Sequence, residues 1–233
     1  FNQMLERLER SFKQASRFSA DAAHELKTPL AILQGELEQM LQQAESGAEQ
    51  QQLGSLLDEV RRLSTIVRKL LLLSLADAGQ MALHKTQVDL SAMLAVAGED
   101  LELLAPHLRT VVDIDPNLYV WGDRDLLLQV IQNLISNAIK YNLPEGWVRI
   151  TAHQRAKSVQ VSVTNASSGI TAGDRVFERF YRGDPSHNRR VEGLGLGLSL
   201  SREIVQAHGG TLVLDTTPAD QTQFTMTLPR RPQ

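Results

Sequence analysis

The apolar residues of the first forty positions recur every three or four residues, which is the period of one face of an α-helix. A second set with the same period follows a break near Glu45, Ser46 and Gly47. Two helices this apolar on one side cannot cover their own stripes as a lone hairpin. The pattern therefore predicts a four-helix bundle made from two copies of the chain, and the alternative is that both stripes pack on the rest of the chain. The first stripe comprises Leu5, Leu8, Phe12, Ala15, Ala22, Leu26, Leu33, Leu37 and Met40, and the second comprises Leu53, Leu56, Leu57, Val60, Leu63, Ile66, Val67, Leu70 and Leu73.

One histidine lies off the first stripe. His24 is two residues from the stripe positions on either side of it, so at about 100° per residue it faces away from them. Glu25 is adjacent, and its carboxylate could hold one ring nitrogen protonated and leave the other free to attack an electrophile. Thr28 shares the face of the histidine one turn on, and Pro29 predicts a kink just after it. The alternative is an ordinary surface histidine on an amphipathic helix.

Composition limits the function classes open to the chain. Its 233 residues, 42% of them hydrophobic, allow one large or two modest domains with a real core. A net charge of −3 offers no broad basic field for nucleic acid, and the absence of cysteine excludes disulfides and thiolate metal sites. No apolar run approaches the roughly 18 residues of a membrane span. Because the chain opens at Phe1 already in helical rhythm, we expect it to be a piece of a longer protein.

From Gly79 onward, shorter segments alternate between two-residue and helical periods, which predicts an α+β layer. Asp123 can cap the helix that follows it. The other histidines show no metal-ligand spacing and are predicted to be surface or capping residues: His84, His107, His153, His187 and His208. The expected strands are 81–88, 111–115, 118–121, 148–151, 159–164, 211–215 and 224–228, and the expected helices are 90–106, 123–140 and 198–208.

The helix expected at 123–140 carries polar residues suited to a nucleotide. Asn133 and Asn137 are four residues apart and project from one helical face, where two amides could reach a hydrated magnesium ion or phosphate oxygens. Lys140 brings a cation to that face, and Tyr141 can place a ring near a base or sugar. The alternative is that the asparagines bond only to neighbouring loops.

Two further segments favour an anionic ligand. Glycine and leucine alternate immediately before an expected helix, at Gly193, Gly195 and Gly197, with Leu196 between the last two. Glycines and the free amides of a helix start let a phosphate approach the backbone. The span 171–192 carries five arginines around an aromatic cluster, and loops this long in compact domains tend to be functional or disordered. The alternatives are a flexible loop and a solvated, salt-bridged surface loop.

These motifs occur in the order found in bacterial two-component sensor histidine kinases, which the chain resembles from about Phe18 to Leu228. The residues His24, Glu25, Thr28 and Pro29 resemble the phosphoacceptor box, the stretch DLLLQVIQNLISNAIKYN resembles the N box, and FERFYR and GLGLGL resemble the phenylalanine and second glycine-rich boxes of GHKL ATPases. The resemblance implies an α+β fold: an N-terminal helical hairpin at 1–79 that forms a dimeric four-helix bundle and accepts phosphate, then a GHKL α/β sandwich at 80–233, with a mixed sheet and helices on one face, that binds ATP.

The resemblance also implies roles for individual residues. Asn137 would be the principal magnesium ligand with Asn133 supporting it, Lys140 and Arg182 would contact phosphates, and Tyr141 would flank the adenine and ribose. ATP with Mg²⁺ would phosphorylate His24, with Glu25 taking up its proton, and the phosphoryl group would pass to an aspartate of a response regulator. Thr28 would position water for dephosphorylating that partner. The remaining N-terminal part would place this cytoplasmic core at the inner membrane.

One box departs from the family pattern. Where the family has Asp-x-Gly-x-Gly, with the aspartate accepting a hydrogen bond from the adenine amino group, this chain has Asn165, Ala166, Ser167, Ser168 and Gly169. An amide oxygen can still accept from that amino group, but the same amide can turn and offer its donor to the keto oxygen of guanine. A signalling scaffold or phosphatase-only protein with impaired ATP use is therefore the alternative. A third alternative is an ATPase of the topoisomerase, mismatch-repair or chaperone kind, which shares the nucleotide-binding boxes. That alternative does not explain the helix that carries His24.

Overall fold

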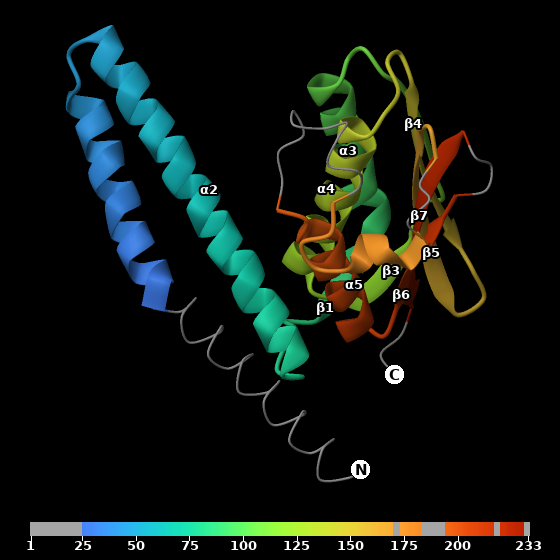
Figure 1. Ribbon diagram of the computed structural model, residues 1–233. Coiled ribbons are helices and arrows are strands. Elements are labelled where there is room, and N and C mark those ends of the chain that lie inside the picture. The colour runs from blue at the N-terminus through green and yellow to red at the C-terminus, as the bar shows by residue number, and fades with distance from the viewer. Residues whose placement is uncertain (1–24, 170–172, 183–193, 217–219, 231–233) are drawn as a thin grey trace. The chain divides into compact units, whose positions relative to one another are not determined.

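The computed structural model describes residues 25–169, 173–182, 194–216 and 220–230. It divides into two compact units, Phe1–Met81 and Ala82–Gln233 (Figure 1), and each is described by itself. His24, His187 and Gly193 lie outside the described residues. None of the helices in these ranges has the length and apolarity needed to cross a lipid bilayer.

The first unit is a helical hairpin, as its apolar pattern predicts. Residues 25–43 are helical without interruption at Pro29, and α2 spans Gly47–Asp77. Ser46 caps α2, because its hydroxyl accepts a hydrogen bond from the Glu49 amide at 3.2 Å. The two helices bury Leu37, Leu53, Leu57 and Val60 between them.

Much of the apolar surface of this hairpin is not covered by the hairpin itself. Leu26 is 49% exposed, Met40 is 52% exposed and Leu56 is 49% exposed, although all three belong to the predicted stripes. Ile32, Leu33 and Leu63 are also exposed. The apolar residues of this hairpin thus divide into a buried set and an exposed set. The exposed set offers apolar surface to a binding partner.

The second unit is a two-layer α/β sandwich. Its five-stranded sheet has the order β2-β4-β5-β7-β6, in which β2 is parallel to β4 and every other pair is antiparallel, so the predicted mixed sheet is confirmed. The three long helices lie on one face of this sheet (Figure 1). The strands are β2 (Arg109–Ile114), β4 (Trp147–Gln154), β5 (Ser158–Ala166), β6 (Thr211–Asp215) and β7 (Gln221–Pro229), and the helices are α3 (Leu90–Leu104), α4 (Arg124–Lys140) and α5 (Gly197–Ala207).

A second, two-stranded sheet corrects one prediction. The strand expected at 81–88 is present only as β1, Thr86–Asp89, which pairs antiparallel with β3, Tyr119–Gly122. Residues 81–85 belong to no helix or strand, and the His84 amide donates to the Asp123 carboxylate at 3.0 Å. The period-two pattern predicted a strand in this region, but it does not reveal over which residues a neighbouring strand is present to pair with it.

His208 was predicted to be a surface or capping residue, and it is the C-cap residue of α5, but at 4% exposure it is buried rather than at the surface. Its Nδ1 lies 2.7 Å from the Ile204 carbonyl, and its Nε2 accepts the Asp123 amide at 2.9 Å. A carbonyl can only accept and an amide N–H can only donate, so these contacts require the neutral tautomer that is protonated at Nδ1. Burial lowers the pKa of His208, repulsion from Lys85 lowers it further, and the Ile204 contact and Asp123 oppose the shift.

We therefore expect acid to destabilise the second unit through His208. Because the folded-state pKa lies below the unfolded value of about 6.5, the contribution of His208 is complete above that pH and is lost as the pH falls below it. Urea unfolding between about pH 7.5 and pH 5.5, a range that brackets that value, should show a smaller loss of stability in His208→Gln than in the wild type. The exposed His107 provides the control, since His107→Gln should keep the wild-type slope. Equal slopes in the wild type and His208→Gln would contradict this.

Candidate nucleotide-binding site

The N-terminal end of α5 packs against the middle of α4, and this brings the glycine-rich segment to the predicted asparagines. The Asn133 Nδ2 donates to the Ser201 hydroxyl at 3.0 Å. The amide of Asn133 also lies over Gly197, where a Cβ atom would come within 2.1 Å of Asn133 Oδ1. No real Cβ makes such a contact, so only glycine fits at this position while Asn133 keeps its place.

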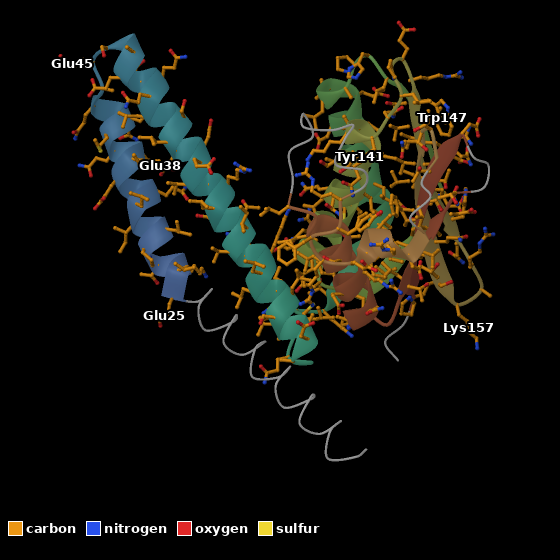
Figure 2. The ribbon with its side chains drawn as sticks, in the orientation of Figure 1. Glu25, Glu38, Glu45, Tyr141, Trp147 and Lys157 are labelled. Atoms are coloured by element: carbon orange, nitrogen blue, oxygen red, sulfur yellow. The ribbon has the colours of Figure 1, made fainter. Side chains whose placement is uncertain are left out.

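The remaining predicted residues of α4 follow at helical spacing. Asn137 lies one turn after Asn133 and is half-buried, whereas Lys140 is exposed near the helix end. Tyr141 is the C-cap residue, with its amide bonded to the Asn137 carbonyl at 3.0 Å and 47% of its surface exposed (Figure 2). Because residues four apart share a helical face, α4 presents two amides, a cation and an aromatic ring along one side and its end.

Asn165, the residue that departs from the family pattern, lies next to the last residue of β5 and is 3% exposed. Its Nδ2 donates to the Ala166 carbonyl at 2.8 Å and to the Tyr141 carbonyl at 3.4 Å. Both partners are acceptors only, so the amide nitrogen must face them and the oxygen must point the other way. The backbone therefore selects one of the two orientations that the sequence leaves open, and Asn165 presents an acceptor, as an aspartate would.

Ser167, which replaces a family glycine, has its own hydrogen bonds at the bend. Its hydroxyl lies 2.7 Å from the Thr222 hydroxyl and accepts the Gly169 amide at 3.2 Å. A serine that accepts a hydrogen bond two residues on makes a turn of its own, in place of the freedom of a second glycine. Gly169 has φ 87°, so the positive backbone angle of this turn falls on the glycine that the chain retains.

The phenylalanine box and the glycine-rich segment are joined by backbone contacts. The Phe180 amide donates to the Gly195 carbonyl at 3.0 Å, and Gly195 has φ 68° with its missing Cβ directed at the Tyr181 carbonyl. Phe177 ends the short 3₁₀ helix Gly173–Phe177 and is buried against Phe224 with ring centroids 6.1 Å apart. Arg182 is exposed at the edge of the described residues.

These residues fit a nucleotide and its metal ion. Gly195 and Gly197 keep two positions of the glycine-rich segment free of side chains, and Asn133 and Asn137 supply the oxygen donors that Mg²⁺ accepts. Within the described ranges, three or more His, Cys, Asp and Glu residues nowhere gather in a way that could hold a metal ion. Asn133 and Asn137 would hold such a metal together with phosphate oxygens of the nucleotide.

In the first unit, Glu25 and Thr28 are both exposed on the helix at 25–43, three residues apart (Figure 2 labels Glu25). Their shared face is open to solvent and thus to a reacting partner. Four contacts of the second unit were not predicted from the sequence: Ser201 beside Asn133, the two carbonyls beside Asn165, and Thr222 beside Ser167. None has a sequence signal of its own: the Ala166 carbonyl is adjacent to Asn165 in the chain, and the other contacts join residues that only the fold brings together.

Each of the two units matches a known domain family. Residues 14–79 match the His Kinase A (phospho-acceptor) domain, and residues 122–232 match the histidine kinase-, DNA gyrase B- and HSP90-like ATPase family. The signal transduction histidine-protein kinase BaeS of Escherichia coli is 36% identical over 233 residues, which cover 98% of this chain and 50% of that protein. The chain thus spans about half the length of the curated relatives it matches.

Solved structures show the same architecture. The histidine kinase AdeS of Acinetobacter baumannii superimposes with a TM-score of 0.63 at 27% identity, over 90% of this chain and 98% of that one. Full-length ShkA, solved in complex with AMPPNP, has the same fold with a TM-score of 0.75 at 23% identity, over 91% of this chain and 45% of that one. Given both domain matches in order and these relatives, the chain belongs to the two-component sensor histidine kinases and carries the phospho-acceptor and ATPase domains of their catalytic core.

Proposed function

We propose that this chain is an ATP-dependent protein-histidine kinase that phosphorylates itself on His24. The observation that carries the proposal is the single face on which α4 and the start of α5 bring Asn133, Asn137 and Gly197 together. In the first unit, Glu25, the neighbour of His24 in the sequence, is exposed. Residues 1–79 act as the dimerisation and phosphoacceptor domain, and residues 80–233 act as the ATP-binding domain.

In this proposal the nucleotide is held by residues of α4, by the glycine-rich segment before α5 and by the turn after β5. Asn137, supported by Asn133, holds Mg²⁺, which neutralises phosphate charge when bound. Lys140 and Arg182 contact the phosphates, while Tyr141 flanks the adenine and ribose, and Asn165 with Gly169 receives the base. Backbone amides of the glycine-rich segment, Gly193, Gly195, Leu196 and Gly197, approach the phosphate oxygens, as helix N-termini do for anions.

The chemical step transfers the γ-phosphoryl group of ATP to an imidazole nitrogen. The free nitrogen of His24 attacks in line, so a nitrogen–phosphorus bond forms as the bond to the β,γ-bridging oxygen breaks and ADP leaves. Glu25 orients the ring and takes up its proton. Positioning and neutralisation of charge provide most of the acceleration in such transfers.

The exposed leucines of the first unit support a homodimer, since a second hairpin would cover them in a four-helix bundle. The partner that receives the phosphoryl group is the aspartate of a response-regulator receiver domain. Thr28, exposed three residues after Glu25, positions water for dephosphorylating that partner. The chain covers half the length of BaeS. In this proposal it is the cytoplasmic core of an inner-membrane receptor, held at the membrane by a segment outside this sequence.

The orientation of the Asn165 amide predicts which purine binds. Its oxygen faces the base, so it accepts from the amino group of adenine but meets the keto oxygen of guanine with a second acceptor. An unsatisfied buried polar group costs about 1–3 kcal/mol, so we expect Mg-ATP to bind about 5-fold to about 150-fold more tightly than Mg-GTP. Titration of the full chain with each nucleotide, read by displacement of a fluorescent ATP analogue, measures the ratio.

Two variants sharpen this titration. Asn165→Ala should lose most of the preference for ATP, whereas Asn142→Ala should keep it, although the Asn142 Nδ2 also donates to two backbone carbonyls, those of Ala138 at 3.0 Å and Trp147 at 3.1 Å. Equal binding of ATP and GTP would show that the Asn165 amide turns freely. No binding of any nucleotide would instead favour a signalling scaffold or a phosphatase-only protein and overturn the proposed function.

A further inference from the structure

The side chain of Asn133 is held from the opposite helix, by α5. Its Nδ2 donates to the Ser201 hydroxyl at 3.0 Å, and its Oδ1 lies beside Gly197, four residues earlier on the same face of α5. The carboxamide therefore lies along the first turn of α5, with its nitrogen end at Ser201 and its oxygen end at the glycine-rich segment.

Ser201 is suited to hold this amide in place. It is 2% exposed, so water cannot readily replace its hydroxyl as a partner for the Asn133 nitrogen. Asn133 itself is only half-buried, and without a fixed partner its amide could rotate between orientations that exchange oxygen and nitrogen. With the nitrogen bonded at Ser201, the oxygen is the end left for a cation.

We propose that Ser201 is a positioning residue for Mg-ATP, which keeps the oxygen of Asn133 directed at the metal and phosphates. The inference rests on the proposed function, because it assumes that Asn133 supports a magnesium ion. Residues that orient metal ligands affect metal affinity about 10- to 100-fold when they are removed. Ser201 thereby also ties the distance between α4 and α5 to the geometry of the nucleotide site.

The binding test is a double-mutant cycle on the full chain. The concentration of Mg²⁺ that half-saturates binding of a fluorescent ATP analogue is measured for the wild type, Ser201→Ala, Asn133→Ala and the double variant. Ser201→Ala should raise this concentration about tenfold, and it should have no further effect once Asn133 is alanine, because it acts through Asn133. A KM effect for Mg-ATP larger than the kcat effect should accompany it.

A readout without ligand separates positioning from general damage. In the nucleotide-free protein, the side-chain amide signal of Asn133 is identified by ¹⁵N NMR as the one that disappears in Asn133→Ala. It should move in Ser201→Ala toward the position of solvent-exposed asparagines. Ser199→Ala provides the matched control on the same helix: Ser199 is 5% exposed, but its hydroxyl donates to its own helix at the Leu196 carbonyl, 3.0 Å away. It should leave the Asn133 signal and the Mg²⁺ dependence unchanged.

The outcomes distinguish the two proposals. Unchanged Mg²⁺ dependence in Ser201→Ala, or an equal effect with and without Asn133, would overturn the role of Ser201 while leaving the nucleotide site intact. If Ser199→Ala and Ser201→Ala weaken binding equally, the effect belongs to buried hydroxyls of α5 in general and the positioning role is also overturned. A wild-type chain that binds no Mg-nucleotide would overturn the proposed function and this inference with it.

Discussion

Replacing Gly197 with alanine weakens Mg-ATP binding by about 5-fold to about 150-fold, the range that corresponds to overpacking costs of about 1–3 kcal/mol. The added Cβ would come within 2.1 Å of Asn133 Oδ1 and 2.9 Å of its Cγ, so the amide must leave its place or α5 must move away from α4. Either movement displaces a proposed ligand of the nucleotide. Titration with a fluorescent ATP analogue, together with thermal unfolding of the nucleotide-free chain, measures both effects.

Two further variants show whether the clash with Asn133 is the cause. In Gly197→Ala/Asn133→Ala the obstructing side chain is absent, so the unfolding midpoint should recover while nucleotide binding stays weak. Gly54→Ala, in the N-terminal third of α2 where an added Cβ meets nothing within 4 Å, should leave binding unchanged and stabilise its helix by up to about 1 kcal/mol. Wild-type binding by Gly197→Ala would show that the nucleotide does not require Asn133 at this position.

The order of helices and strands follows from local patterns in the second unit. The α4 helix begins after Asp123, whose carboxylate accepts the Leu126 amide at 3.2 Å, and ends at Lys140, as the capping residue and the apolar spacing predict. The strand expected at 81–88 is shorter than predicted because pairing depends on a partner, and within the described part of the chain β3 pairs only with residues 86–89. Local pattern thus predicts an extended backbone but not its neighbours.

The site was predictable to the extent that its residues share one element. Asn133 and Asn137 occupy one face because they are four residues apart on a helix, which the sequence states directly. The partner of Asn133 is 68 residues away at Ser201, and the partners of Asn165 are main-chain carbonyls, which every residue has. Which end of each amide faces the ligand therefore becomes visible only when the fold brings these groups together.

His208 illustrates the same limit from inside the core. A histidine just before two glycines reads as a helix cap at the surface, and it does cap α5. Its ring, however, fills the space beside Gly122, where an added Cβ would lie 2.8 Å from it, and joins the start of α4 through the Asp123 amide. Burial at that point depends on a glycine 86 residues earlier, which no local pattern connects to it.

A His24→Ala variant is expected to take up essentially no phosphate from γ-labelled ATP. The reason is chemical: phosphoryl transfer to nitrogen needs an imidazole, and the proposed base Glu25 has no other histidine beside it in the sequence. The variant should still bind Mg-ATP with the affinity of the wild type, because its nucleotide residues are unchanged and lie in the other unit. Loss of ATP binding together with labelling would indicate general damage instead.

The most direct test of the central claim, that the nucleotide site of the second unit phosphorylates the histidine of the first, is to locate the label. The wild-type chain is incubated with Mg²⁺ and γ-labelled ATP, the label is tested for stability in acid and base, and the labelled peptide is mapped by mass spectrometry under alkaline conditions. We predict an acid-labile, base-stable phosphoryl group on His24 that is absent from Asn137→Ala incubated alone. Label on any other residue, or label that persists in His24→Ala, would contradict the account.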